Sequence, residues 1–167
     1  MTITRASFRN GFFAGVLVAI VLGIYLIQLW KPERQIELHS LRLLRAIEQN
    51  DAAALGDFVD PTYRDQWQHD RALLLARVRA VVCYTRHLHL EPREPIIIPT
   101  ANGPEWRARI TVTGDPNEVM TVITERINPL KQPFRLEWRQ QSWKPWDWKL
   151  IRASNEELEL PASGWTG

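Results

Sequence analysis

Apolar residues fill the N-terminal part of the chain without interruption. The run from Gly11 to Trp30 contains no charged residue, and as a helix it would be about 30 Å long, the thickness of the hydrocarbon core of a bilayer. A cleaved signal peptide has a shorter apolar region that ends in small residues, whereas this run ends in Leu29, Trp30, Lys31 and Pro32. The sequence therefore predicts a retained single-pass transmembrane helix over residues 11–30, behind a short basic tail at residues 1–10.

Small residues recur at every fourth position of this run, at Gly11, Gly15, Ala19 and Gly23. Residues four apart share one helical face, and a face of small residues lets a second helix approach closely. We therefore expect these residues to pack against other transmembrane helices of a membrane complex, or against a second copy of the chain. The alternative is that glycine is simply common in membrane helices.

The charges beside the apolar run predict its orientation only weakly. Arg5 and Arg9 precede it without any acidic residue, but Lys and Arg beyond Trp30 leave no clear difference between the two ends. A short basic tail is typical of a signal anchor. We expect a cytoplasmic N-terminus and a C-terminal domain in a bacterial periplasm or an equivalent extracytoplasmic space.

The spacing of apolar residues changes after Pro32. Residues 33–49 repeat apolar positions at steps of three and four, which predicts an amphipathic helix. It follows the apolar run with almost no linker, so the domain should sit close to the bilayer. Asp51, Asp60 and Asp70 have the character of helix caps. They predict further helical pieces at residues 52–58, 61–67 and 71–80.

Strand patterns dominate the second half of the chain. Strands are predicted at residues 81–90, 106–113, 119–127, 134–143 and 146–153, with Trp106, Ala108, Ile110 and Val112 pointing inward. Four prolines predict an irregular crossing or an edge over residues 91–104, with a short extended piece at residues 96–98. Residues 154–167 are predicted to be a loosely held tail. Helices followed by strands indicate an α+β domain, with helices packed on one face of a curved antiparallel sheet, over residues 33–153.

Two stretches of this domain resemble the nuclear transport factor 2-like superfamily. They are LRAIEQNDAAAL at residues 44–55 with FVDPTY at 58–63, and the closing strands FRLEW at 134–138 and WDWKLI at 146–151. The resemblance implies a cystatin-like α+β roll with a cavity between sheet and helices. That superfamily includes enzymes, ligand binders and non-catalytic interaction modules, so the resemblance implies a fold rather than a function.

Enzymatic members that resemble ketosteroid isomerase place an acid and a tyrosine in this cavity. The candidates here are Tyr63, Tyr84, Asp65 and Asp70, although no motif assigns any of them such a role. Tyr63 and Tyr84 are the candidate cavity residues if a ligand is bound. A small-ligand binder or a cyclase/isomerase-like enzyme is therefore the alternative function, and it requires a cavity that is not filled by side chains.

Composition and charge argue against nucleic-acid binding, an intramolecular disulfide and a metal site. With 21 basic and 19 acidic residues, the charge balance gives no reason to propose nucleic-acid binding, which needs a concentrated basic surface. Its single cysteine, Cys83, cannot form an intramolecular disulfide. Cys83, His87 and His89 would share one strand face, but Cys83 would lie too far from His87 for one ligand shell. We expect no metal, no cofactor and no catalytic residue.

Trp143 and Trp146 are predicted at the tip of the last hairpin, around Lys144 and Pro145. A hairpin tip is difficult to bury, and exposed aromatic side chains mark contact surfaces. The sequence as a whole favours a non-catalytic, membrane-anchored accessory or assembly subunit of a larger membrane complex. Its expected partners are the lipid bilayer and other transmembrane helices.

Overall fold

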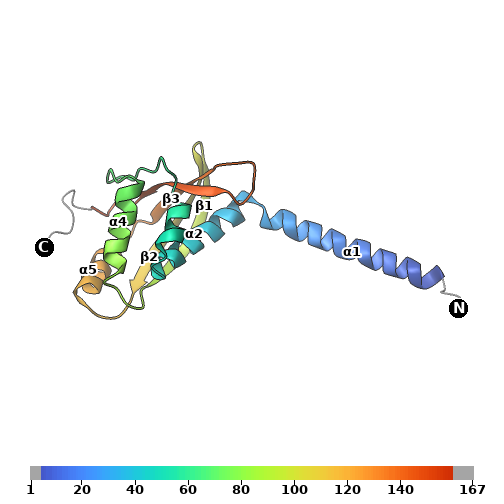
Figure 1. The fold of residues 1–167 in the computed structure, drawn as a ribbon, viewed down its shortest axis with the longest axis horizontal. Helices are drawn as coiled ribbons and strands as arrows, with labels where there is room; N and C mark the ends of the chain where they lie inside the picture. Colours follow the sequence, from blue (N-terminus) through green and yellow to red (C-terminus); the bar gives the residue numbers. More distant parts are fainter. Residues whose placement is uncertain (1–4, 160–167) are drawn as a thin grey trace.

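The computed structural model describes residues 5–159, with side chains from residue 13 onward except at residue 29. A long helix, α1 (Arg5–Leu29), projects away from an α+β domain (Figure 1). The domain begins with the helices α2 (Pro32–Glu48), α3 (Ala52–Phe58) and α4 (Arg71–Val82). It continues with β1 (His89–Thr100), β2 (Gly103–Thr113), α5 (Glu118–Ile127), β3 (Phe134–Gln140) and β4 (Trp148–Ser154). The predicted α+β class is confirmed.

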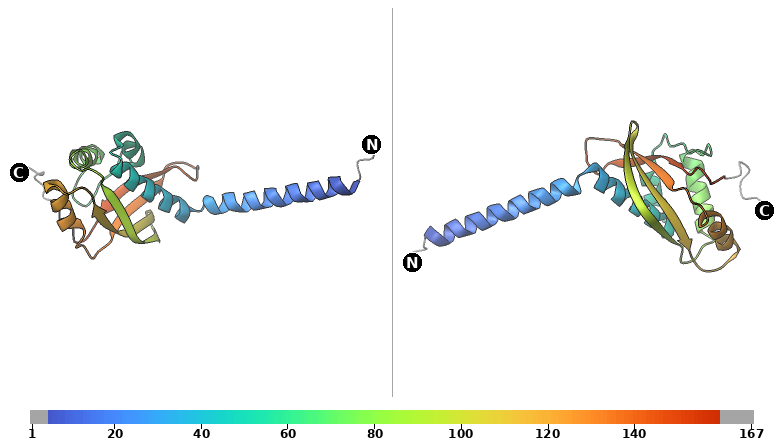
Figure 2. Two further views of the ribbon diagram at one scale, coloured as in Figure 1. Left: turned by 90° about the horizontal axis from the view of Figure 1, so that it is seen from below. Right: turned by 180° about the vertical axis from the view of Figure 1, so that it is seen from behind.

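The four strands form one antiparallel sheet in the order β1-β2-β3-β4. The register shifts between Arg93 and Ile96 in β1, and again between Glu137 and Trp138 in β3. Such irregularities bend a strand and increase its twist. Helices α2, α3 and α4 lie together along one side of the sheet (Figure 2).

The core lies between α2 and the inner face of the sheet. Helix α2 contributes Ile36, Leu43 and Leu44, as its spacing predicts, while the sheet contributes Trp106 and Trp138, both 0% exposed. Of the residues of β2 expected to point inward, Ala108 and Val112 are also buried, whereas Ile110 is only partly buried.

Residues 119–127 form helix α5 rather than the predicted return strand. Asn117 caps the helix, because its side chain accepts a hydrogen bond of 2.8 Å from the backbone N–H of Met120. Met120 is the buried residue of this helix, and Val119, Val122 and Ile123 are spaced at helical steps. Their β-branched side chains indicated a strand, but the cap and this spacing determine the structure.

Two other parts of the second half also differ from prediction. Helix α4 extends to Val82, so residues 83–88 are a turn and β1 begins only at His89. Residues 91–104 form most of β1 and the start of β2, so the predicted edge is confirmed, but the extended segment is much longer than residues 96–98. Since β1 is an edge strand, its prolines need not donate to a neighbour on both sides.

Local hydrogen bonds explain two further differences from the predicted structure, at residues 61–67 and in the C-terminal tail. Residues 61–67 form no helix, because the side chain of Asp65 accepts hydrogen bonds from the backbone of Trp67 and His69 and holds a tight turn. The described part of the C-terminal tail is fixed rather than loose. Asn155 is 0% exposed, and its side chain contacts Gln132 and the backbone of residues 157 and 158.

Helix α1 confirms the predicted helical conformation of the apolar run. Its apolar side chains are open to solvent, with Phe13 at 62%, Leu17 at 65% and Ile27 at 65% exposure. In the described part of the chain, no helix taken singly is both long and apolar enough for a membrane span, but Phe13–Gln28 and α2 meet the criterion jointly as a pair bent by 65°. Membrane crossing by α1 stays a prediction.

Candidate functional site

The connection between β3 and β4, residues 141–147, presents the two tryptophans expected at the hairpin tip. Trp143 is 86% exposed and Trp146 is 54% exposed. We call this segment the tryptophan loop. The prediction of their position is confirmed, whereas their contact with a partner stays a prediction.

Hydrogen bonds within the tryptophan loop hold it in one conformation. The backbone N–H of Gln141 donates to the carbonyl of Asp147 over 2.8 Å, and that of Asp147 donates to the carbonyl of Lys144 over 3.2 Å. The indole of Trp148, which is buried beneath the loop, donates to the carbonyl of Pro145 over 2.8 Å. One tryptophan is therefore in the core while Trp143 and Trp146 remain outside it.

His39 connects the tryptophan loop to α2. It is 6% exposed, and its Nε2 lies 3.0 Å from the carbonyl oxygen of Trp146, while its Nδ1 lies 2.8 Å from that of Gln35. The ring also packs edge-on against Phe58 and Trp138, with centroid distances of 6.0 and 5.9 Å. A neutral imidazole has one N–H, so it can donate to only one of the two carbonyls at a time.

Burial lowers the pKa of His39 below its ordinary value of 6.5, although the hydrogen bonds to Gln35 and Trp146 act in the opposite direction. The patterns in the sequence assigned no position to His39. The available signal was its spacing, since it follows Ile36 by three residues and precedes Leu43 by four, which places it on the buried face of α2.

Asp60 provides a second connection to the tryptophan loop. It is 1% exposed and accepts hydrogen bonds from Thr62, at 2.7 Å from the backbone N–H and 2.6 Å from the hydroxyl. Its other carboxylate oxygen accepts from Arg139 over 3.1 Å and from the side-chain amide of Gln141. Burial raises the pKa of Asp60, but these hydrogen bonds outweigh burial and hold the pKa below 3.8.

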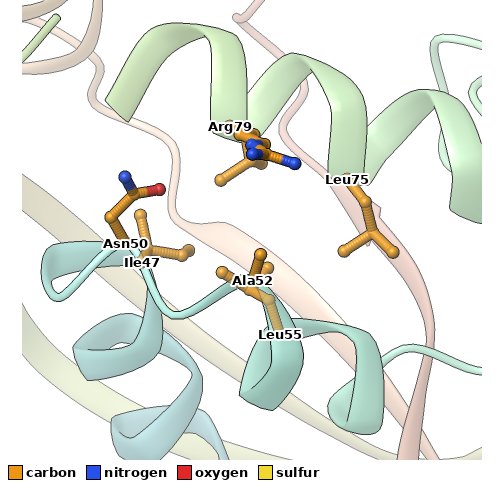
Figure 3. Close-up of a pocket in the computed structure, with 7 residues that line it drawn as sticks. Ile47, Asn50, Ala52, Leu55, Leu75 and Arg79 are labelled. Carbon is orange, nitrogen blue, oxygen red and sulfur yellow. The ribbon is translucent and has the colours of Figure 1, made fainter. Parts of the chain in front are cut away.

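The space between helices and sheet is filled by side chains. Ile36, Val59, Tyr63, Trp106 and Trp138 are each at most 2% exposed and occupy the interior of the roll. A small cleft of about 20 Å³ lies between α2, α3 and α4 (Figure 3). That volume holds about one water molecule. Its lining residues are Ile47, Asn50, Ala52, Leu55, Leu75, Val78 and Arg79.

The two predicted cavity residues lie in different surroundings. Tyr63 is 1% exposed within the packed core, where burial and then the charge of Asp65 raise the pKa of its hydroxyl. Tyr84 is 68% exposed, because α4 ends at Val82 and the chain turns outward there. Tyr84 therefore does not line the interior.

Several polar atoms of the core have no hydrogen-bond partner among the described residues. They are Ser40 Oγ, the Tyr63 hydroxyl, Trp106 Nε1 and Trp138 Nε1. Each such group costs about 1–3 kcal/mol relative to a satisfied one. A ligand or water inside the roll would be able to bond to groups of this kind.

Asp65 and His69 form a buried pair next to this core. Their Oδ2 and Nδ1 atoms are 2.8 Å apart, and both residues are 5% exposed. Aspartate and histidine are suitable for proton transfer, but neither residue lines the small cleft between the helices or the larger cleft on the sheet. Asp65 also accepts two backbone hydrogen bonds, which gives the pair a role in the turn.

The larger cleft, of about 440 Å³, lies on the face of the sheet opposite α2. Its lining residues are Arg93, Glu94, Ile96, Arg107, Arg109, Lys131 and Pro133. Its volume is within the range of ligand sites, but such sites are mostly apolar. Each of its arginines is already paired with a glutamate, including Arg109 with Glu94 at 2.8 Å and Arg93 with Glu91 at 3.3 Å.

The cysteine and histidines considered as metal ligands do not share a strand face. Cys83 is exposed in the turn after α4, His87 pairs with Asp115 at 3.0 Å, and His89 pairs with Glu48 at 2.9 Å. No group of three His, Cys, Asp or Glu side chains suited to a metal ion occurs where side chains are described.

Comparisons with known proteins identify the fold. No family model matches the chain, and no curated protein matches it. Bd1075 of Bdellovibrio bacteriovorus is similar in structure, with a TM-score of 0.55 and 10% identity over 77% of this chain, which spans only 41% of that protein.

Two further solved structures are similar over most of their own length. An NTF2-like protein of Cytophaga hutchinsonii has a TM-score of 0.51 and 16% identity, over 74% of this chain and 95% of that one. A candidate aromatic ring hydroxylase of Novosphingobium aromaticivorans has a TM-score of 0.55 and 13% identity, over 75% and 87%. At these identities the likeness shows the fold alone. The chain has the NTF2-like α+β roll that its sequence resembles.

Proposed function

We propose that this chain is a non-catalytic, membrane-anchored accessory or assembly subunit of a larger membrane complex. Helix α1 crosses the bilayer from a cytoplasmic N-terminus, and the NTF2-like domain lies on the extracytoplasmic side. Protein contacts are made by α1 and by the surface of the domain.

The exposed apolar surface of α1 is the observation that carries this proposal. Every large apolar side chain described between Phe13 and Ile27 is at least 39% exposed. A helix that is apolar on all sides needs apolar surroundings. Residues 11–30 include twelve Leu, Ile, Val or Phe residues, which together favour insertion by about 4–7 kcal/mol at membrane-centre values.

The packed domain supports the non-catalytic part of the proposal. Trp106, Trp138 and Tyr63 fill the interior, where a cyclase or isomerase would hold its substrate. The unpartnered polar atoms of the core are the one observation that favours the alternative, a small-ligand binder or enzyme of this fold. They would need a rearranged interior to reach a ligand.

Membrane extraction and affinity purification of the full chain test this proposal. We expect a tagged chain to remain in native membranes after a carbonate wash and to bring partner subunits with it in mild detergent. Loss of the chain in the carbonate wash would contradict the anchor. Recovery of the chain alone, as a monomer, would contradict the accessory role.

The small-residue face of α1 can be tested without disturbing the fold of the chain. A Cβ added at Gly15 or Gly23 meets no atom within 4 Å, so the double variant Gly15→Leu with Gly23→Leu should insert normally. We expect it to lose most of the co-purifying partner. The matched double variant Leu17→Phe with Ile24→Phe adds bulk on the opposite side of the helix, and it should leave the partner yield unchanged. Equal yields for all variants would show that the face makes no contact.

A further inference from the structure

We propose that the tryptophan loop is a second membrane contact, in which Trp143 and Trp146 enter the headgroup layer of the leaflet where α1 ends. The contact would fix the orientation of the domain on the bilayer. This proposal rests on the proposed membrane anchoring of α1. The exposure of the two tryptophans alone does not identify their partner, and the proposal names lipid as that partner.

The chemistry of the exposed side chains fits the headgroup layer. Trp143 and Trp146 are 86% and 54% exposed, and Trp30, at the end of α1, is 46% exposed. Tryptophan combines a large apolar ring with one N–H donor, and it is enriched where membrane and water meet. Trp30 is the last residue of the predicted span, so it marks the level of that layer.

The loop lies at the same end of the domain as α1. His39 holds the carbonyl of Trp146 at 3.0 Å, and His39 is only seven residues beyond Pro32, where α2 begins. In Figures 1 and 2 the segment between β3 and β4 reaches toward the junction of α1 and α2, whereas α5 lies at the far end of the domain.

The bend between α1 and α2 keeps His39 near the membrane surface. The two helices are bent by 65°, so seven residues of α2 rise only about 4–5 Å along the axis of α1. For α1 along the bilayer normal, this height is within a headgroup layer about 5–8 Å thick. The tryptophan loop is therefore at a depth that its side chains can reach.

Two connections present the loop rigidly. His39 holds Trp146 from α2, and Asp60 holds the beginning of the loop through Arg139 and Gln141. A surface that is already ordered loses little conformational entropy when it binds. The loop therefore does not have to fold when Trp143 and Trp146 contact the bilayer.

The charges of the loop favour neutral lipid as the partner. Lys144 and Asp147 are the charged residues of residues 141–147, and their charges cancel. Attraction to anionic lipid requires a cluster of basic residues. Contact should therefore occur with phosphatidylcholine and change little when anionic lipid is added.

A nitroxide label on the full chain measures the depth of the loop. The chain is placed in phosphatidylcholine vesicles, with Cys83→Ser and Lys144→Cys for a label on the loop. A second sample keeps the native Cys83, which is exposed in the turn beside α5 and serves as the matched far-end control. Collision rates with oxygen and with a water-soluble nickel chelate report burial in lipid.

We expect the label at position 144 to be several-fold less accessible to nickel than the label at Cys83. Adding Trp143→Ser and Trp146→Ser should raise its accessibility to that of Cys83. Equal accessibility of both labels, with the chain still resistant to carbonate, would overturn the loop contact and leave the anchor intact. Protection in native membranes but not in lipid vesicles would assign the loop to a protein partner and also overturn it. Loss of the chain in carbonate would instead refute the anchor itself.

Discussion

Replacing His39 by leucine should destabilise the domain and release the tryptophan loop. The substitution removes the one N–H of the neutral ring, and with it the hydrogen bond that this N–H donates to the carbonyl of Gln35 or of Trp146. Losing this hydrogen bond costs about 1 kcal/mol, and each edge-on contact, with Phe58 and Trp138, contributes about 0.5–1.5 kcal/mol. Leucine restores part of the apolar contact. We therefore expect a loss of about 2–3 kcal/mol in the free energy of unfolding.

Urea unfolding of the full chain in a non-ionic detergent, followed by tryptophan fluorescence, measures this loss. His89→Leu is the matched control, because the side chain of His89 is 66% exposed and, among the described residues, is paired with Glu48 at 2.9 Å. Exposed pairs contribute about 0–1 kcal/mol. An His39→Leu variant that unfolds at the same urea concentration as the wild type would show that His39 does not hold the loop.

The pH dependence of the same measurement tests the electrostatic part of the argument. Burial lowers the pKa of His39 below 6.5 in the folded chain. The unfolded chain therefore binds the proton at a higher pH than the folded chain, and stability falls as the pH decreases from 6.5 toward the folded pKa. His39→Leu should lose less stability than the wild type over that interval. Equal slopes would contradict the lowered pKa.

Two other predictions concern the packed interior and the sheet. Tyr63→Phe should raise the free energy of unfolding by about 1–3 kcal/mol, because it removes a buried hydroxyl without a hydrogen-bond partner among the described residues; a loss above about 1.5 kcal/mol in urea unfolding would show that the hydroxyl makes a hydrogen bond in the folded chain. Gly103→Ala should cost about 2 kcal/mol or more, because φ is +126° and the new Cβ would collide with the carbonyl oxygen of Trp138. Gly56→Ala is the control for this substitution. Gly56 lies within α3, and a Cβ added there would be 3.4 Å from the side chain of Arg71. Alanine is the better helix former, so stability should be unchanged or slightly higher. Thermal unfolding of both variants distinguishes these outcomes.

Sequence patterns correctly predicted the helices and strands whose structure depends on the spacing of their own residues. Helix α2 has the helical period of its buried face, and β2 has the alternation that buries Trp106 and Ala108. Helix α5 was missed because Val119, Val122 and Ile123 favour strands individually, while the deciding cap lies outside them at Asn117. The full length of strand β1 was missed because its prolines are acceptable only at an edge, and the position of a strand within its sheet is not a local property.

The candidate site was predictable only in part, for the same reason. Lys144 and Pro145 predicted a hairpin tip, and therefore the exposure of Trp143 and Trp146. The contact between His39 and Trp146 joins residues 107 positions apart. No pattern near either residue indicates the other. A lone histidine on a helical face is compatible with a core residue as well as with a functional one.

Residues of the sheet both fill the interior of the domain and support the tryptophan loop. Trp106 and Trp138 occupy inward positions of neighbouring strands, and their rings fill the space where the sequence resemblance implied a cavity. Trp138 also contacts His39, which holds the tryptophan loop. The residues that close the interior therefore support the surface at the end of the domain nearest α1. A roll packed in this way has little room in its described interior, and it presents a contact face at the end of the domain nearest α1, which is the property that the proposed accessory subunit requires.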